Sequence, residues 1–465
     1  MAADSSPRRQ AHAELWAWHA RHLPKIRHDE LEDGIADAYK MGRTSVSSLY
    51  NAESLADRLS ERTNTSRLRT LSEEGLQVRL RTYGYAQYPK APREWTLAGL
   101  TLGRINLVVG KNASGKSRTL STINGLGDLV SGRRKPSDLS SGTYEATFEH
   151  EGRTLRYFLD ICDRKVVAEE FSDGGTVLLT RGAGGIGKIF HEKEKGSLDF
   201  QTPEGDAAVV ARRDIIQHHF LEPLGQWGEG VRHYAFGDKM GHGTVAIIVQ
   251  NGPTPDPRDV NAIVALFRKG VKDFPDRFAA AVRDGMNAIG YEITEVSVMV
   301  PTDISFMMPV GSRMDPLILF AQEQDLPCPT QQMEMSQGMF RALSVIILLT
   351  YAVIASRPSC IIVDDIGEGL DFERSCKLID LMRRQARDAD VQLIVSTNDK
   401  FVMNAVPLDE WSVLRRQGNH VTVRNHENSK KEFEHFRFVG MSNFTFFEMD
   451  FANGALKMET APAHE

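Results

Sequence analysis

An eight-residue glycine loop, Gly110-Lys-Asn-Ala-Ser-Gly-Lys-Ser117, limits what this chain can fold into more than any other feature. It matches the pattern G-x-x-x-x-G-K-[ST] and lies between the apolar run 105–109 (INLVV) and a helical pattern over about 117–129. A loop of this kind joins a buried strand to a helix, and its backbone N–H groups can surround phosphate oxygens. The loop therefore predicts an α/β fold with a phosphate site, and an ordinary glycine turn is the alternative.

We expect the whole loop to act on one phosphate ligand. The Lys116 ammonium group would reach the β- and γ-phosphates, and the Ser117 hydroxyl would bind Mg²⁺. A second, shorter match at 182–188 is followed by Ile189, which offers no oxygen to a metal, so we interpret it as a turn between strands. The predicted nucleotide-binding residues of the loop are Gly110, Lys111, Asn112, Ala113, Ser114, Gly115, Lys116, Ser117 and Arg118.

Two carboxylates end a second apolar strand, Cys360-Ile-Ile-Val-Asp364-Asp365. Asp364 would hold the Mg²⁺ shell, and Asp365 would orient or deprotonate an attacking water molecule. Taken alone, this segment is as compatible with an ordinary strand that leads into a loop as with a catalytic strand end. Together with the glycine loop, it predicts a site for nucleoside triphosphate hydrolysis.

Ser336, Gln337 and Gly338 begin a further helix, directly before a long apolar run. A hydroxyl and free N–H groups at a helix N-terminus attract phosphate, although Ser336 as an ordinary helix cap is the alternative. The apolar run 345–355 is too short to span a bilayer, and we expect it to be a buried helix.

The pattern of apolar residues divides the chain into an extension and one split domain. Residues 1–75 predict a helical N-terminal extension, with a partly ordered tail as the alternative. Residues 76–250 hold the glycine loop and a β-rich lobe, 251–330 form a helical and β insertion, and 331–465 alternate helix and strand before a terminal hairpin and tail. We also expect helix over 206–233, and over 259–289 a helix that Pro275 bends or divides. Alternation of helix and apolar strand predicts a parallel sheet flanked by helices.

Composition excludes several classes of protein. Of 465 residues, 41% are hydrophobic and 25% charged, with a net charge of -6, which argues against a disordered chain and a strongly basic nucleic-acid binder. Four scattered cysteines predict neither a disulfide framework nor a zinc site. With no signal-peptide pattern, we expect a cytoplasmic protein without a membrane segment. Three basic groups are expected to be solvated surface: Arg133-Arg134-Lys135, Arg212-Arg213 and Arg383-Arg384.

The order of these motifs resembles an ABC-type ATPase head, most closely the RecF/SMC/OLD-like group often called AAA family ATPases. MSQGMFR (335–341) stands where the signature motif is found, the strand ending at Asp364 is similar to a Walker B strand, and Gly369-Leu370-Asp371 resembles the D-loop. The resemblance covers about residues 76–400 and implies a P-loop head with a β-rich lobe and a helical insertion, using ATP and Mg²⁺.

The resemblance further implies a head-to-tail ATP sandwich, a homodimer or higher homo-oligomer. Ser336, Gln337 and Gly338 of one subunit would contact the γ-phosphate held by Lys116 of the other. This implies an ATPase that works as a dimerisation switch or sensor. Its expected partner is an effector protein on another chain, and nucleic acid is a further candidate partner. The resemblance points to a role in anti-phage defence or DNA maintenance. The alternatives are an ATP-dependent assembly scaffold with little hydrolysis and, less favoured, a transporter ATPase subunit.

Two departures from the family pattern predict slow hydrolysis. Asp365 stands where Glu is usual, and Asn398 occupies a switch position that is often His. The predicted catalytic residues are Asp365, Lys116 and Asn398, with Glu368 as a second acidic candidate. OLD-like nucleases carry a Toprim domain after the head, whereas here about 65 residues follow Asn398, so we expect the effector on another chain. In that tail, the aromatic residues Phe433, Phe436 and Phe438 are expected to be core or docking surface.

Overall fold

A computed structural model describes most of the chain beyond the N-terminal segment. The chain divides into two compact units, Met1–Gly75 and Leu76–Glu465. The predicted N-terminal extension lies outside the described residues. Those residues are 78–236, 241–248, 254–275, 277–302, 315–356, 358–437 and 441–450.

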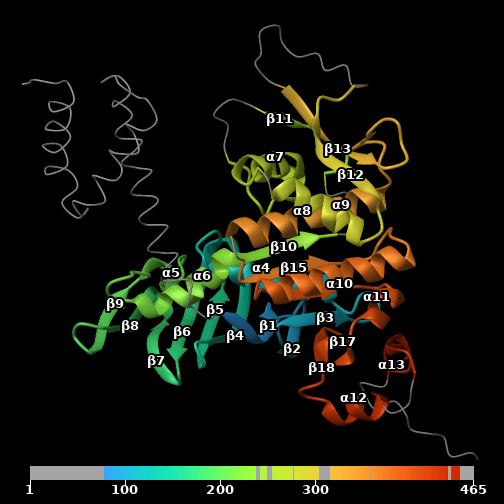
Figure 1. Cartoon of the computed structure of the whole chain (residues 1–465). Helices are drawn as coiled ribbons and strands as arrows, with labels where there is room; N and C mark the ends of the chain where they lie inside the picture. The colour runs from blue at the N-terminus through green and yellow to red at the C-terminus, as the bar shows by residue number, and fades with distance from the viewer. Residues whose placement is uncertain are drawn as a thin grey trace, which may run out of the picture. The chain divides into compact units, whose positions relative to one another are not determined.

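Fourteen of the described strands form one mixed sheet, in the order β10-β15-β16-β3-β17-β18-β2-β1-β4-β5-β6-β7-β8-β9 (Figure 1). The first five are parallel to one another, and β1 and β4 to β9 follow as an antiparallel lobe. Their bounds are β1 (Arg79–Gln87), β2 (Trp95–Thr101), β3 (Ile105–Val109), β4 (Ser141–His150), β5 (Arg153–Cys162), β6 (Lys165–Asp173), β7 (Thr176–Gly182), β8 (Ile186–His191), β9 (Gly196–Gln201), β10 (Val231–Ala235), β15 (Cys360–Asp364), β16 (Gln392–Ser396), β17 (Trp411–Gln417) and β18 (His420–Asn425).

The predicted parallel, helix-flanked sheet is confirmed in the core. Because successive side chains of a strand point to opposite faces, the apolar strands β3, β15 and β16 supply two hydrophobic cores at once. Leu107 and Ile361 pack with α9 and α10 on one face, and Val108 and Ile362 with α4 and α6 on the other. The helices are α4 (Lys116–Val130), α5 (Ala208–Ala211), α6 (Glu222–Gly230), α7 (Ile263–Asp273), α8 (Phe278–Ala288), α9 (Gln337–Tyr351), α10 (Phe372–Asp388), α11 (Lys400–Ala405), α12 (Lys430–Arg437) and α13 (Asn443–Glu448).

A buried glutamine fastens the antiparallel lobe to the parallel core. The Gln392 side chain on β16 accepts a hydrogen bond from the Leu80 backbone N–H on β1 at 3.2 Å. It donates to the carbonyl oxygens of Leu80 and Gly103, each at 2.8 Å. The sheet also continues across β18 and β2, which pair in parallel. The lobe is therefore an extension of the core sheet.

A smaller sheet and two helices lie between β10 and β15 in the sequence. β11 (Ala246–Ile248), β12 (Ile293–Met299), β13 (Asp315–Glu323) and β14 (Thr330–Gln331) form the sheet, and α7 and α8 pack against α9. As predicted, the helical segment divides near Pro275, since α7 ends at Asp273 and α8 begins at Phe278.

One prediction of helix is wrong over much of its length. Residues 206–233 contain the short α5 and α6 and a single helical turn at His219–Leu221, and the last three residues belong to β10. Between the two helices, the Asp214 carboxylate accepts hydrogen bonds from the N–H groups of Ile216 and Gln217, both at 2.8 Å. A side chain that bonds to nearby backbone in this way favours a turn over a helix.

The apolar helix after Ser336 is a core helix in this structure. Gln337–Ala355 is the one described helical segment long and apolar enough to cross a membrane by length and composition, and 83% of it is buried inside the protein. The predicted C-terminal hairpin and packing tail are present as β17, β18, α12 and α13. Phe433 and Phe436 are buried there against Phe446, whereas Phe438 lies outside the described residues.

Candidate functional site

Three neighbouring parallel strands end at the same edge of the sheet and carry the predicted catalytic residues. β15 pairs with β16 and β16 with β3, all in parallel. The glycine loop follows β3, Asp364 and Asp365 lie at the end of β15, and Asn398 follows β16. In open α/β sheets, ligands bind outside the carboxyl ends of the strands. The structure thus brings together segments about 250 residues apart in the sequence.

The loop is shaped by residues with positive φ and by one close packing contact. Ala113 has φ 63°, and Gly115 has φ 102° immediately before α4. A Cβ atom on Gly110 would lie 2.4 Å from the Ser114 hydroxyl oxygen and 3.0 Å from the Leu414 carbonyl oxygen, so a larger residue there would force its neighbours to move. The loop reaches the N-terminus of α4 with its first helical residues, Lys116 and Ser117, at the mouth of the site.

Lys116 is buried at the centre of the site, with only 7% of its surface exposed. Its ammonium group donates to the Gly110 carbonyl oxygen and to the Asn398 amide oxygen, both at 2.8 Å. Burial lowers the pKa of Lys116, and the nearby Asp365 and Asp364 carboxylates partly oppose that effect.

The two aspartates are held differently by one serine. The Ser396 hydroxyl donates to the buried Asp364 carboxylate and accepts from the Asp365 backbone N–H at 2.9 Å. Asp365 has φ 60°, and its carboxylate accepts from the Asn398 amide N–H at 3.2 Å. A continuous chain of polar contacts therefore runs from Gly110 through Lys116 and Asn398 to Asp365.

Burial raises the pKa of Asp365 above its ordinary value. The neighbouring Glu368 and Asp364 carboxylates raise it further, whereas Lys116 and the hydrogen bond from Asn398 lower it. A carboxylate with a raised proton affinity is a candidate for a general base.

The remaining loop residues divide between the site and its surroundings. Ser117 is exposed in the first turn of α4, while the Arg118 guanidinium group lies 4.3 Å from the ring centre of Trp95 and hydrogen bonds to Gln87. Arg118 thus contacts the first hairpin of the lobe. Ser117 and Asp364 supply the hydroxyl and carboxylate oxygens that Mg²⁺ prefers. No group of three or more His, Cys, Asp or Glu residues suited to a metal ion occurs within the described ranges.

The predicted signature residues lie beside the D-loop residues of the same chain. Ser336 caps α9 by accepting from the Met339 N–H at 3.2 Å, and both Ser336 and Gln337 are exposed. Gly338 packs so closely that a Cβ atom would lie 2.2 Å from the Gly369 carbonyl oxygen. Among the described residues, no hydrogen bond or ion pair joins 336–338 to 110–118. The two predicted nucleotide contacts are therefore not bonded to each other in the described part of the chain.

Two contributors to this region escaped the sequence interpretation. Ser396 bonds both aspartates, and its one signal was its place as the last residue of an apolar strand. Arg341, on the signature helix, donates to the Glu368 carbonyl oxygen at 3.1 Å and lies 3.8 Å from the Glu368 carboxylate. No sequence pattern indicated that contact, because it joins residues 27 positions apart.

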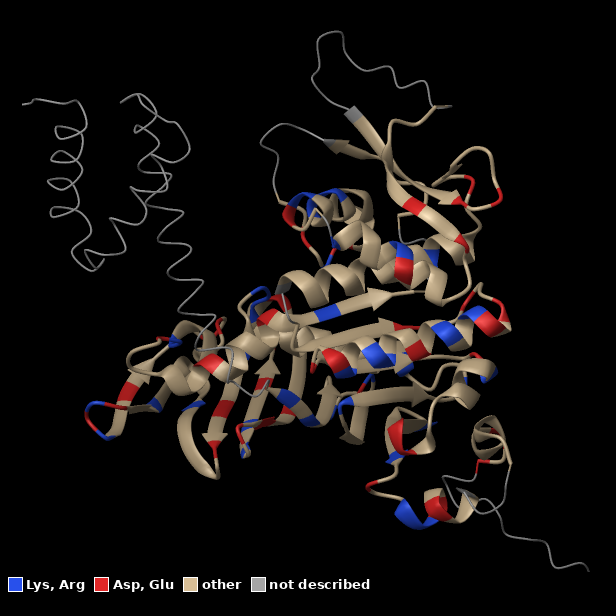
Figure 2. Ribbon diagram, viewed as in Figure 1, with Lys and Arg blue, Asp and Glu red and all other residues tan. Residues whose placement is uncertain are grey.

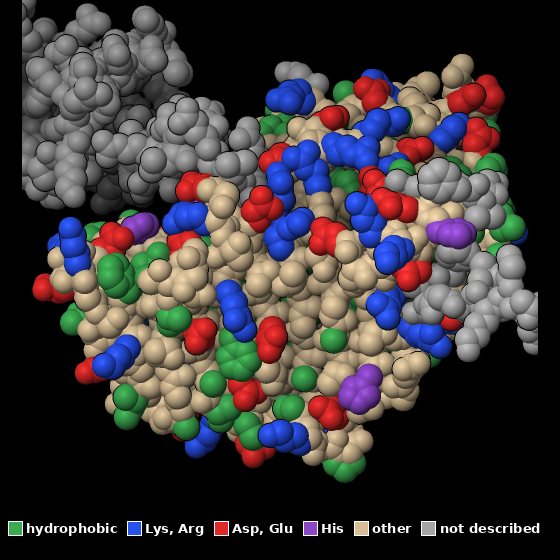
Figure 3. Space-filling model, turned by 90° about the horizontal axis from the view of Figure 1, so that it is seen from below, with side chains coloured by type: hydrophobic (Ala, Val, Ile, Leu, Met, Phe, Trp, Pro, Cys, Tyr) green, Lys and Arg blue, Asp and Glu red, His purple; other side chains and the backbone are tan. Residues whose placement is uncertain are grey.

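The three basic groups singled out in the sequence each contain an arginine that is paired within the chain. Ribbon and surface views show both signs of charge intermingled over the molecule (Figures 2 and 3). Paired arginines offer less charge to a phosphate backbone. Arg383 is itself buried, with 8% of its surface exposed, so the expectation of solvated surface is wrong for this residue. The pairs are Arg133 with Asp128 at 2.8 Å, Arg213 with Glu222 at 2.7 Å, and Arg383 with Glu410 at 2.9 Å.

Comparison with known proteins finds similarity at the level of structure alone. No protein-family model matches the chain, and no curated protein does. Solved structures of SMC head domains are similar at 11 to 13% sequence identity. One is the SmcHead bound to the C-winged helix domain of ScpA, with a TM-score of 0.44 and 13% identity, covering 77% of this chain and 99% of that chain. Another is the SMC head domain from Thermotoga maritima, with a TM-score of 0.38 and 12% identity, covering 75% of this chain and 98% of that chain. A third is the Smc head domain with an extended coiled coil, bound to the C-terminal domain of ScpA from Pyrococcus furiosus, with a TM-score of 0.42 and 11% identity, covering 78% of this chain and 100% of that chain.

Proposed function

We propose that this chain is an ABC-type ATPase that binds ATP with Mg²⁺, hydrolyses it slowly and uses it to pair two heads. The observation that carries the proposal is the chain of contacts from Gly110 through Lys116 and Asn398 to Asp365. It joins the ends of three parallel strands next to a loop whose geometry suits phosphate. A buried, unpaired ammonium group would be costly, and here a phosphate can replace its two acceptor atoms.

Each residue then has a distinct role in hydrolysis. The Lys116 ammonium group exchanges its bonds to Gly110 and Asn398 for phosphate oxygens. Asn398, released from Lys116, can donate to the γ-phosphate while it still holds Asp365. The Asp365 carboxylate orients the attacking water molecule and takes its proton. Mg²⁺, held by Ser117 and Asp364, would supply charge neutralisation at the phosphates.

The test of ATP binding uses two lysines that both end a GxxxxGK sequence. Lys116→Ala should abolish saturable ATP binding and ATPase activity in the full chain, because it removes the central phosphate ligand. Lys188→Ala is the matched control, since Lys188 lies on β8 at the far end of the sheet, in the turn region that we interpret as structural. Equal ATP affinity of the Lys116→Ala variant and the wild type would refute the proposed site.

The pairing of heads is supported by the exposure of Ser336 and Gln337, which leaves this helix end open to a second molecule. Asp365→Asn should block hydrolysis and accumulate an ATP-bound dimer, measured as molar mass by light scattering with and without ATP. Ser336→Ala should weaken that dimer. An assembly scaffold with little hydrolysis predicts instead that Asp365→Asn leaves ATP-dependent mass unchanged, and this result would favour the alternative.

The proposal extends to the biological role of the ATPase. A switch of this kind needs an effector protein on another chain, and the resemblance of the motifs favours anti-phage defence or DNA maintenance. Purification with the neighbouring gene product, with Lys116→Ala as the control, tests for such an effector. Co-purification that depends on ATP and is lost in the variant is the expected result.

A further inference from the structure

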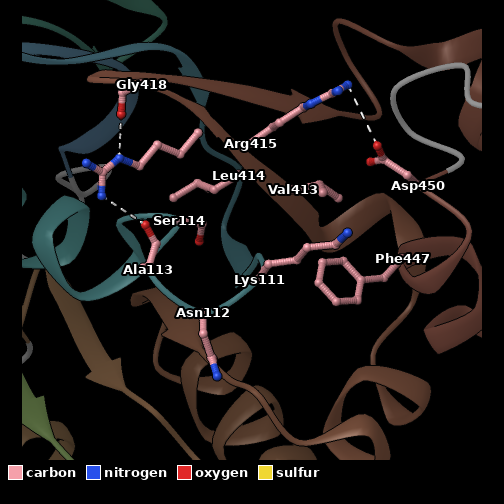
Figure 4. Close-up of a pocket in the computed structure, with 11 residues that line it drawn as sticks. Lys111, Asn112, Ala113, Ser114, Val413, Leu414, Arg415, Gly418, Phe447 and Asp450 are labelled. Atoms are coloured by element: carbon pink, nitrogen blue, oxygen red, sulfur yellow. Dashed lines mark hydrogen bonds and ion pairs between the residues drawn. The ribbon is translucent and has the colours of Figure 1, made fainter.

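A cavity of about 490 Å³ lies beside the first half of the phosphate loop (Figure 4), and Lys116, Asp364 and Asp365 are not among the residues that line it. One wall is the first half of the loop, one is β17 with the turn that follows it, and the third is formed by Phe447 of α13 and by Asp450, two residues after that helix ends. Its volume is in the range of small-molecule sites. The residues that line it are Lys111, Asn112, Ala113, Ser114, Val413, Leu414, Arg415, Arg416, Gly418, Phe447 and Asp450.

Positive charge dominates this cavity. Arg416 is used structurally, since it donates to the Gly418 carbonyl oxygen at 2.7 Å and to the Ala113 carbonyl oxygen at 3.3 Å, and so ties the hairpin turn to the loop. Arg415 lies 3.7 Å from the Asp450 carboxylate, and both side chains are more than a third exposed, so this pair is weak. The Lys111 side chain is exposed, and its ammonium group makes no hydrogen bond or ion pair with any described residue, although the Lys111 carbonyl oxygen accepts from the Ser114 N–H at 3.0 Å. An anion would therefore be attracted here.

Two further features indicate the kind of anion. The Ser114 hydroxyl lines the cavity, is buried (the residue is 5% exposed) and has no hydrogen-bond partner among the described residues. A buried hydroxyl without a partner is costly, and a ligand oxygen would satisfy it. The half-buried ring of Phe447 and the side chain of Val413 supply an apolar wall; in Figure 4, Lys111 extends past that ring.

We propose that this cavity binds a small organic anion that carries a planar ring, of the class of a nucleoside monophosphate. The anionic group would contact Lys111, Arg415 and the Ser114 hydroxyl, and the ring would lie against Phe447. The site goes beyond the proposed ATPase function, because none of the residues proposed for catalysis lines it. Residues 111–114 belong to both the cavity and the phosphate loop, so the two ligands influence each other's affinity reciprocally.

The experiment is titration calorimetry of AMP into the full chain carrying Lys116→Ala, which removes the main phosphate ligand of the ATP site. The expected result is saturable binding of one AMP per chain. Adding Arg415→Ala should weaken that binding about tenfold, the usual scale for one charge-assisted hydrogen bond. Adding Lys188→Ala, which removes another exposed charge far away on β8, should leave it unchanged.

A second variant tests the ring separately from the charge. Phe447→Leu keeps the apolar volume but removes the aromatic face, so AMP should bind more weakly while inorganic phosphate binds as before. The absence of AMP binding to Lys116→Ala overturns the proposal, as does AMP binding that Arg415→Ala leaves unchanged. The ATPase activity of the otherwise unaltered chain is measured in parallel, so loss of this site is distinguishable from failure of the proposed function.

Discussion

At the scale of single residues, the most informative is Asp365. Its backbone adopts φ 60°, a left-handed conformation that Asp and Asn tolerate better than most residues. The conformation gives a physical reason for Asp where the resembling family has Glu. The shorter side chain is kept in place by the Asn398 amide. Asp365 therefore fits the left-handed backbone at this position, but its carboxylate does not extend as far as that of a glutamate would.

Asp365→Glu should accelerate ATP hydrolysis. The added methylene advances the carboxylate by about 1 Å, and a misplacement of that size can cost about 100-fold in rate. The left-handed backbone should make the variant less stable by about 1 kcal/mol. Steady-state kcat and a denaturation midpoint measure the two effects, with Asp365→Asn as the inactive control. If kcat is unaltered by Asp365→Glu but falls in Glu368→Gln, Glu368 is the base.

At the scale of elements, the start of α9 is locked to the turn that precedes α10. Gly338 lies against the Gly369 backbone, and Arg341, one turn further along, donates to the Glu368 carbonyl oxygen. Glu368 in turn raises the pKa of Asp365. The start of α9 and the proposed base are thus connected through one short turn.

Gly338→Ala should disrupt this lock. A Cβ atom 2.2 Å from a carbonyl oxygen forces the helix and the turn apart, at a cost of about 1–3 kcal/mol in the free energy of unfolding. Chemical denaturation measures that cost, and the exposed neighbour provides the control, since Gln337→Ala should change stability by less than about 0.5 kcal/mol. If Gly338→Ala were as stable as Gln337→Ala, the contact between Gly338 and the Gly369 backbone would have to yield easily, and the lock would be disproved.

At the scale of the whole described unit, Gln392 holds the lobe and the core together. It bonds the Leu80 backbone, 312 residues away, from inside the sheet. The partly buried pair of Arg79 and Asp390, at 2.6 Å, is a second link at this junction. The buried amide, with three partner groups, is the stronger link.

Gln392→Leu should therefore destabilise the unit by about 1–3 kcal/mol for each buried group left without a partner. We expect hydrogen exchange to speed up first at the β1 amides. Gln417→Leu, at the exposed end of β17, is the control and should leave exchange unchanged. A uniform increase across both lobe and core would instead show that the sheet opens only as a whole.

Features that depend on neighbouring residues could be predicted from the amino-acid sequence. The phosphate loop, the strand ending in Asp364 and Asp365, the division of the helix near Pro275 and the turn after Gly182 all follow from local conformational and apolar patterns. The same local reasoning failed over 206–233, where the Asp214 side chain competes with the helix for backbone hydrogen bonds.

Which of these segments lie side by side could not be predicted from the sequence and is seen only in the folded chain. The contact of Asn398 with Lys116 and Asp365, the role of Ser396, the bond from Gln392 to Leu80 and the cavity beside Ser114 all join residues distant in sequence. Apolar periodicity identifies which face of a strand is buried, but it carries no information on which other strand lies beside it. Strand order is settled by long-range packing and buried hydrogen bonding, which have no local signature.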